Sequence, residues 1–152
     1  MKNIQELLQQ PAVYLHNFTD CIDVVAAFND IYMGSDEYYA PKSPYPAHDH
    51  WEERKNKLTE ALKGFTDVNI LFASYGEDNY SGDAWVLFEK AGVLFEVNGS
   101  HCSCYGLEGQ WEPESVELEE LQNRLLKGTF GMDSYSDNVF APELKTFLGI
   151  QS

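Results

Sequence analysis

Histidine and cysteine residues form two short clusters whose side chains could hold a metal ion. The first cluster is His101, Cys102 and Cys104, and the second is His48 and His50. Zinc prefers thiolate and imidazole ligands, so a four-ligand zinc site would use Cys102, Cys104, His48 and His50. A single residue separates the cysteines, whereas structural zinc sites usually place two or more between them. In an extended strand the two sulfur atoms would share a face about 7 Å apart, too far for one metal ion without a bend.

The same cysteines raise the alternative of a cysteine-dependent enzyme. A catalytic cysteine needs a lowered pKa and a base within hydrogen-bonding distance. His101 directly precedes Cys102, and neighbouring side chains of a strand point to opposite faces, so we do not expect these two to pair. His16, His48 or His50 would have to act as the base, and no motif of a known cysteine-enzyme family surrounds the cysteines.

Three glycines, Gly99, Gly106 and Gly109, bracket the cluster around His101. Glycine tolerates positive φ angles and a close approach of other backbone, so these positions predict a tightly bent segment. They do not form the Gly-x4-Gly-Lys or Gly-x-Gly-x2-Gly patterns of phosphate-binding loops. We therefore interpret residues 98–111 first as a structural turn and only second as a site.

The elements that must position these residues can be read from apolar patterns. Runs at 84–90 and 93–97 flank Ala91 and Gly92, a two-residue link typical of a β-hairpin, and a third β-rich run covers 68–75. Apolar residues occupy both faces of the hairpin strands, so helices are expected to cover at least one side. We predict an α+β fold for one domain spanning residues 1–152. Its small antiparallel sheet has at least three strands and a central hairpin, packed with about four to five helices.

Capping residues and helical spacing place the helices. Thr19 or Asp20 can cap the second helix and Gly34 can end it, while Pro113 or Ser115 can begin the fourth. The expected helices cover residues 3–10, 20–33, 50–63, 113–127 and 142–148.

Acidic residues outnumber basic ones, with 25 Asp and Glu against 10 Lys and Arg and a formal charge of −15. Such a surface repels nucleic acids and anionic membranes, so we expect no direct contact with either. It attracts basic surfaces, including those of proteins that themselves bind nucleic acid. Solubility alone is the simpler explanation of the same charge.

The expected location is the cytoplasm. No apolar run approaches the roughly 20 residues that cross a bilayer, and the first residues lack the apolar core of a secretory signal. Three cysteines, an odd number, argue against a disulfide framework and suit a reducing compartment.

Two kinds of side chain could form a protein-binding surface. The aromatic candidates, Tyr38, Tyr39 and Tyr45, lie in a proline-rich stretch, and rigid aromatic residues of this type are favoured at interfaces. The acidic candidates crowd the start of the fourth expected helix and the loop beyond it. They are Glu112, Glu114, Glu117, Glu119, Glu120, Asp133 and Asp137.

Residues 80–90 and 94–114 together resemble a set of small uncharacterised proteins encoded in bacteriophage and prophage genomes, and the likeness continues through 125–131 and 143–149. The resemblance covers the second half of the chain and transfers no catalytic residue. It implies a bacterial host cytoplasm and an inhibitor or modulator of a host protein. We hypothesise an acidic protein that occupies a basic surface on its partner, in one form by mimicking nucleic-acid charge on a defence protein.

Overall fold

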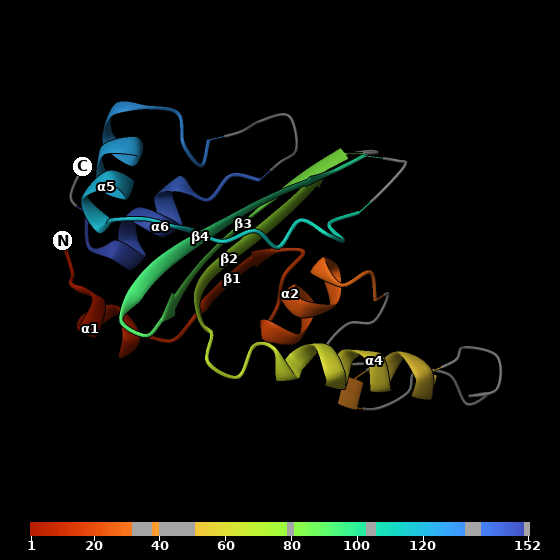
Figure 1. The fold of residues 1–152 in the computed structure, drawn as a ribbon. Helices are drawn as coiled ribbons and strands as arrows, with labels where there is room; N and C mark the ends of the chain where they lie inside the picture. The colour runs from red at the N-terminus through yellow and green to blue at the C-terminus, as the bar shows by residue number, and fades with distance from the viewer. Residues whose placement is uncertain (32–37, 40–50, 79–80, 103–105, 133–137, 151–152) are drawn as a thin grey trace.

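The fold is built on a five-stranded sheet with helices on both faces (Figure 1). The computed structural model describes residues 1–31, 38–39, 51–78, 81–102, 106–132 and 138–150. In chain order the elements are α1 (Ile4–Leu8), β1 (Val13–His16), α2 (Cys21–Phe28), α4 (Trp51–Lys63), β2 (Asn69–Asp78), β3 (Ser81–Lys90), β4 (Val93–His101), β5 (Glu114–Ser115), α5 (Leu118–Lys127) and α6 (Ala141–Leu148).

The sheet has the spatial order β1-β2-β3-β4-β5. The pairs β2–β3, β3–β4 and β4–β5 are antiparallel, which confirms the predicted α+β fold and its central hairpin. Ala91 and Gly92 both have positive φ angles, 54° and 81°, as a two-residue hairpin turn requires. The prediction did not include β1, which pairs parallel to β2 and makes the sheet mixed.

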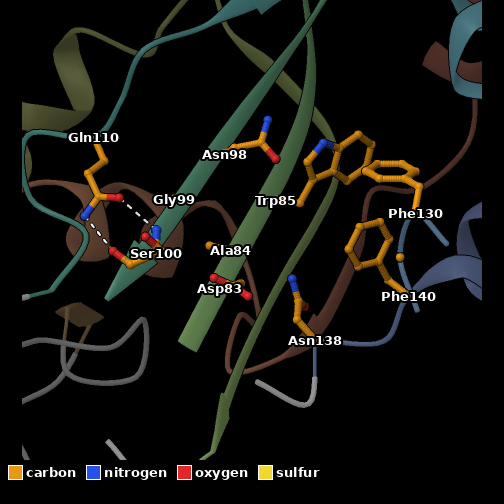
Figure 2. Close-up of a pocket in the computed structure, with 11 residues that line it drawn as sticks. Asp83, Ala84, Trp85, Asn98, Gly99, Ser100, Gln110, Phe130, Asn138 and Phe140 are labelled. Atoms are coloured by element: carbon orange, nitrogen blue, oxygen red, sulfur yellow. Dashed lines mark hydrogen bonds between the residues drawn. The ribbon is translucent and has the colours of Figure 1, made fainter. Parts of the chain in front are cut away.

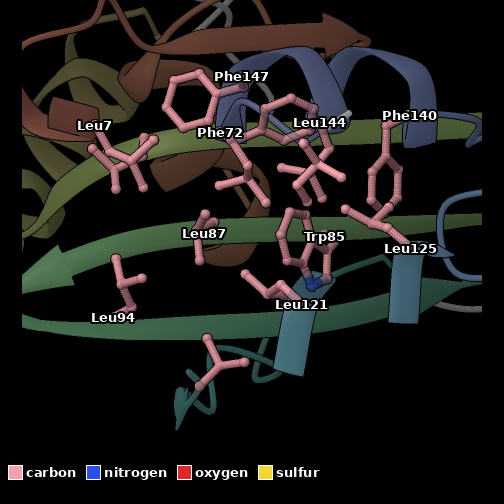
Figure 3. Close-up of a cluster of buried hydrophobic side chains, with 14 of the residues drawn as sticks. Leu7, Phe72, Trp85, Leu87, Leu94, Leu121, Leu125, Phe140, Leu144 and Phe147 are labelled. Carbon is pink, nitrogen blue, oxygen red and sulfur yellow. The ribbon is translucent and has the colours of Figure 1, made fainter. Parts of the chain in front are cut away.

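Alternating side chains of the hairpin strands point into two separate cores. Trp85 and Leu87 face α1, α5 and α6, and Figure 3 shows this core, with Leu121, Leu144 and other apolar residues packed against them. We call this side of the sheet the α5–α6 face. Val86 and Phe88 point to the opposite side, where α2 covers the sheet; we call it the α2 face. Helix α4 lies outside α2 and packs on it through Leu58.

Most helix ends agree with the sequence patterns. Asn3 caps α1 in a capping box with Glu6, and Asp20 caps α2 by accepting a hydrogen bond from the Asp23 backbone. Gly149, with φ at 73°, ends α6. No helix in the described ranges is both long and apolar enough to cross a membrane.

Helix α2 is shorter than predicted, because it ends at Phe28 rather than near Gly34. The Asn29 side chain donates a hydrogen bond to the Val25 carbonyl at 2.7 Å, and Asp30 adopts a positive φ of 55°. An Asn side chain that satisfies a terminal carbonyl competes with continuation of the helix.

The predicted start of the fourth helix, at Pro113 or Ser115, is wrong. Glu114 and Ser115 instead pair with β4 as β5, and the Val116 amide donates to the Leu94 carbonyl at 3.0 Å. Helix α5 begins at Leu118, with Glu117 as its N-cap residue. Glu112 and Glu114 therefore lie outside the helix on which we expected them: Glu114 pairs with β4, and the Glu112 amide donates to the Gln110 carbonyl at 2.9 Å.

The two-sided core can be tested on a single helix. Leu121 of α5 is 0% exposed, whereas Leu126 of the same helix is 45% exposed. We expect Leu121→Ala to lower the free energy of unfolding by about 2–5 kcal/mol because it leaves a cavity. The matched control, Leu126→Ala, should change it by less than about 0.5 kcal/mol. Urea unfolding measures both, and equal effects would contradict the packing of α5 on the sheet.

Candidate functional site

A buried carboxylate, Glu96, joins β4 to α5 on the α5–α6 face. It is 4% exposed, and Arg124 donates to its two oxygens at 2.9 Å each. The Trp85 indole donates a third hydrogen bond at 3.0 Å. Arg124 also binds Glu120 one turn earlier on α5, at 2.7 Å. Planar two-point pairing of this kind fixes geometry as well as charge.

Two opposing effects set the ionisation of Glu96. Burial alone would raise the carboxyl pKa, but hydrogen bonds from Arg124 and Trp85 and the charge of Arg124 outweigh it, so the pKa lies below its ordinary value. Hydrogen bonding to Glu96 in turn raises the pKa of Arg124. Both side chains are therefore charged at neutral pH.

A cavity of about 330 Å³ opens on the same face, where β3 and β4 approach the segment between α5 and α6 (Figure 2). Its aromatic wall contains Trp85 and Phe140, stacked nearly parallel at 5° with ring centroids 5.1 Å apart, and Phe130 edge-on to both. Asp83 and Asn98 contribute polar side chains from the strands. The cavity thus combines an apolar wall with several polar groups, as small-molecule sites do.

Asn138 brings a buried amide to this cavity. The residue is 3% exposed, and its Oδ1 accepts a hydrogen bond from Ser74, itself 0% exposed, at 2.5 Å. Among the described residues no acceptor is found for its Nδ2 group. In Figure 2 this nitrogen points toward the space between Asp83, Trp85 and Phe140.

The Gln110 side chain closes the end of β4. Its Oε1 accepts from the Ser100 amide at 2.8 Å, and its Nε2 donates to the Ser100 carbonyl at 2.7 Å and to the Gly106 carbonyl at 2.8 Å. These bonds hold the returning segment against the strand (Figure 2). Gly109 takes a positive φ of 76° just before it, as a tight bend requires. Residues 98–101 continue β4, so the bend begins later than the glycine pattern predicted.

The His101 imidazole lies beside a tyrosine. Its Nδ1 lies 2.6 Å from the Tyr75 hydroxyl, across the intervening strand β3. Gly82 makes this possible, since a Cβ there would lie 2.6 Å from the imidazole Cε1.

Of the four predicted zinc ligands, Cys102 lies among the described residues. Cys102 is half-buried and not in a disulfide, whereas Cys104, His48 and His50 lie outside the described residues. Within the described part of the chain, no three metal-ligating side chains gather. The zinc site and the reactivity of Cys102 and Cys104 stay predictions.

The predicted binding residues separate into two groups. Glu112, Glu114, Glu117, Glu119 and Glu120 are all exposed along β5 and the start of α5. Tyr38 and Tyr39 lie beside α4, where the Tyr38 hydroxyl is 3.3 Å from Thr59 and its ring lies beneath the Lys55 ammonium group. Figure 1 places α4 and α5 on opposite sides of the sheet, so these groups do not form one surface. Tyr45, Asp133 and Asp137 lie outside the described residues.

Comparison with known proteins found no matching family model, no matching curated protein and no matching solved structure. The function must therefore be argued from the surfaces and cavities of this chain.

Sequence reasoning missed Glu96, Asn138 and Gln110. Glu96 carried one available signal, an acidic residue inside an apolar strand, which predicts a buried partner. Asn138 and Gln110 carry no local signal, because their partners are contributed by distant strands.

The Glu96–Arg124 pair makes a pH-dependent prediction. We expect Glu96→Gln to lower the free energy of unfolding at pH 7 by about 2 kcal/mol, because charged hydrogen bonds are lost. The pKa of Glu96 is lower in the folded protein than its unfolded value of about 4.3, so this stabilisation is complete above that pH. It disappears as the pH falls through the folded pKa.

The stability difference between wild type and Glu96→Gln should therefore shrink during acidification below about pH 4. Urea unfolding across this range measures the difference, with exposed Glu119→Gln as the matched control. A difference that stays constant or grows toward low pH would contradict the lowered pKa.

Cys21 should be a slow nucleophile. Burial, and then the nearby charge of Asp20, raise the pKa of its thiol, which is the opposite of what a catalytic cysteine needs. In a Cys102→Ser, Cys104→Ser variant, we expect the remaining thiol to react with a disulfide reagent at least about tenfold more slowly than free cysteine at pH 7. The unfolded variant is the control, and a folded rate equal to it would refute the prediction.

Proposed function

We propose that this chain is an acidic binding protein whose outer sheet edge occupies a basic surface on another protein. The observation that carries the proposal is the run of exposed glutamates at β5 and the start of α5. We call these five residues the acidic edge: Glu112, Glu114, Glu117, Glu119 and Glu120.

The charges of the protein are unevenly distributed, which favours a docking role over general solubility. Residues 106–120 contain six glutamates and no lysine or arginine. Helix α4, across the sheet, holds Arg54, Lys55, Lys57 and Lys63 against three glutamates. An approaching basic protein is therefore steered toward the acidic edge rather than toward α4.

The acidic edge is held in a defined shape. β5 pairs with β4 directly opposite Glu96, and Glu120 is tied to Arg124, whose guanidinium group also binds Glu96. The other four glutamates make no ion pair with any described residue, so their charges are available to a partner. A preorganised surface loses less conformational entropy on binding than a mobile acidic tail.

Apolar groups beside the acidic edge can supply short-range contacts. A cavity of about 380 Å³ is lined by Met1 and Val93, which are 51% and 44% exposed, next to Glu117 and Glu119. The proposed mechanism is electrostatic capture followed by apolar contact here, rather than at the distant tyrosines.

The resemblance to phage-encoded proteins supports a bacterial partner, such as a host protein that itself binds nucleic acid. In that case the acidic edge would take the place of a phosphate backbone. Binding would then weaken with salt and compete with DNA.

Two variants that remove the same charge test the acidic edge. The edge variant replaces four glutamates of the acidic edge with Gln: Glu112, Glu114, Glu117 and Glu119. The control variant replaces four acidic residues elsewhere: Asp30 with Asn, and Glu52, Glu60 and Glu143 with Gln. Each has a formal charge of −15 + 4 = −11. Immobilised wild type and variants are exposed to bacterial lysate at several salt concentrations, and captured proteins are quantified by mass spectrometry.

We expect a basic protein that wild type and control capture equally and that the edge variant captures about tenfold less, because only that variant loses the local field. Added DNA should displace this protein in the charge-mimic form of the proposal. If both variants lose the same partners equally, the acidic edge has no special role.

A further inference from the structure

We propose that the cavity in Figure 2 binds a single uncharged sugar ring, and that the buried amide of Asn138 donates a hydrogen bond to it. This proposal is independent of docking through the acidic edge. It concerns the start of β3, the end of β4 and the segment leading into α6, and it does not involve β5.

Asn138 provides the first reason. The Nδ2 group of Asn138 is reached by solvent through the cavity, so it can donate a hydrogen bond to a ligand oxygen as readily as to water. Asn138 is 3% exposed, and Ser74 fixes its orientation by donating to Oδ1. Its Nδ2 group, for which the described residues supply no acceptor, points into the cavity (Figure 2). A ligand oxygen placed there would replace water as the acceptor for this group.

The other polar groups of the cavity define the ligand further. Asn98 and Ser100 reach the cavity from β4, and Asp83 reaches it from β3. A carboxylate has about four acceptor positions, so Asp83 can accept from a ligand in addition to its contacts within the protein. The cavity therefore offers both donors and acceptors around one rim. A sugar ring matches this mixture because every hydroxyl group both donates and accepts.

Charge argues against anionic ring-sized ligands. Phosphorylated sugars and nucleotides are anionic, whereas this protein carries a formal charge of −15 and a carboxylate in the cavity itself. Among the described residues that line the cavity there is no lysine or arginine. The ligand is therefore neutral or cationic.

Shape and apolar surface fit a single ring. The volume of about 330 Å³ lies at the lower end of the range for small-molecule sites. Phe130 is partly exposed beside the nearly buried pair of Trp85 and Phe140, so a ring edge is offered to the C–H groups of a sugar. Binding by such a small ligand would be weak, with a Kd on the order of 1 mM.

Protein NMR can test the proposal on the full chain. ¹H–¹⁵N spectra are recorded during titration with four neutral sugars: glucose, galactose, mannose and N-acetylglucosamine. We expect at least one to shift the backbone amides of Asp83, Asn98, Ser100 and Gly131, together with the Asn138 side-chain NH₂ signals. The methyl glycoside of that sugar separates a free ligand from the terminal ring of a glycan, which has a substituted anomeric oxygen.

A charge series on one ring tests the electrostatic argument. Glucosamine, glucose and glucuronate present a cation, a neutral ring and an anion. We expect glucuronate to bind at least about tenfold more weakly than its neutral counterpart, because it must approach Asp83. Equal binding of all three, or tightest binding of glucuronate, would overturn the assignment.

Asn138→Asp provides the decisive variant, because it keeps the shape and the acceptor for Ser74 while removing the NH₂ donor. We expect it to weaken binding by at least about tenfold. Asn123→Asp, an equal charge change at an exposed position of α5, should leave binding unchanged. If no sugar shifts the cavity signals, or if both variants bind like wild type, the proposal is wrong.

Discussion

The two-point hydrogen bonding between Arg124 and buried Glu96 determines how the second half of the chain is arranged. A carboxylate placed inside an apolar strand must be paired, and Arg124 pairs with it from α5, which lies over the sheet. With α5 in this position, β5 pairs with β4 just before the helix, and Phe130 just after the helix packs on Trp85. The acidic edge and the cavity are therefore two consequences of one buried ion pair.

Much of the fold could be predicted because its signals are local. The hairpin turn, the β-rich runs and the caps of α1 and α2 each depend on a few neighbouring residues. β1 and β5 could not be predicted, because each is short and exists only through pairing with a distant strand. The same cause explains the misplaced start of α5: proline and acidic residues allow a helix there, but the sheet edge provides stronger partners for the backbone.

The candidate sites, like the strands, could be predicted only where their signals are local in sequence. Exposure of the glutamates at 112–120 follows from their composition, whereas their arrangement beside a strand depends on β5. The cavity could not be foreseen, since Ser74 and Asn138 are far apart in sequence and neither belongs to a known motif. His101, which the sequence suggested as a metal ligand or base, lies within hydrogen-bonding distance of the Tyr75 hydroxyl.

The amide of Gln110 has a further consequence for behaviour in concentrated solution. An uncovered edge strand can recruit a strand from another molecule and start aggregation. Gln110 occupies both hydrogen-bonding positions of Ser100 with its own side chain, so the outer end of β4 is sealed without an additional strand. Gln110 thus covers the end of the β4 edge and β5 covers its start, so the part of this edge that could pair with another molecule is short.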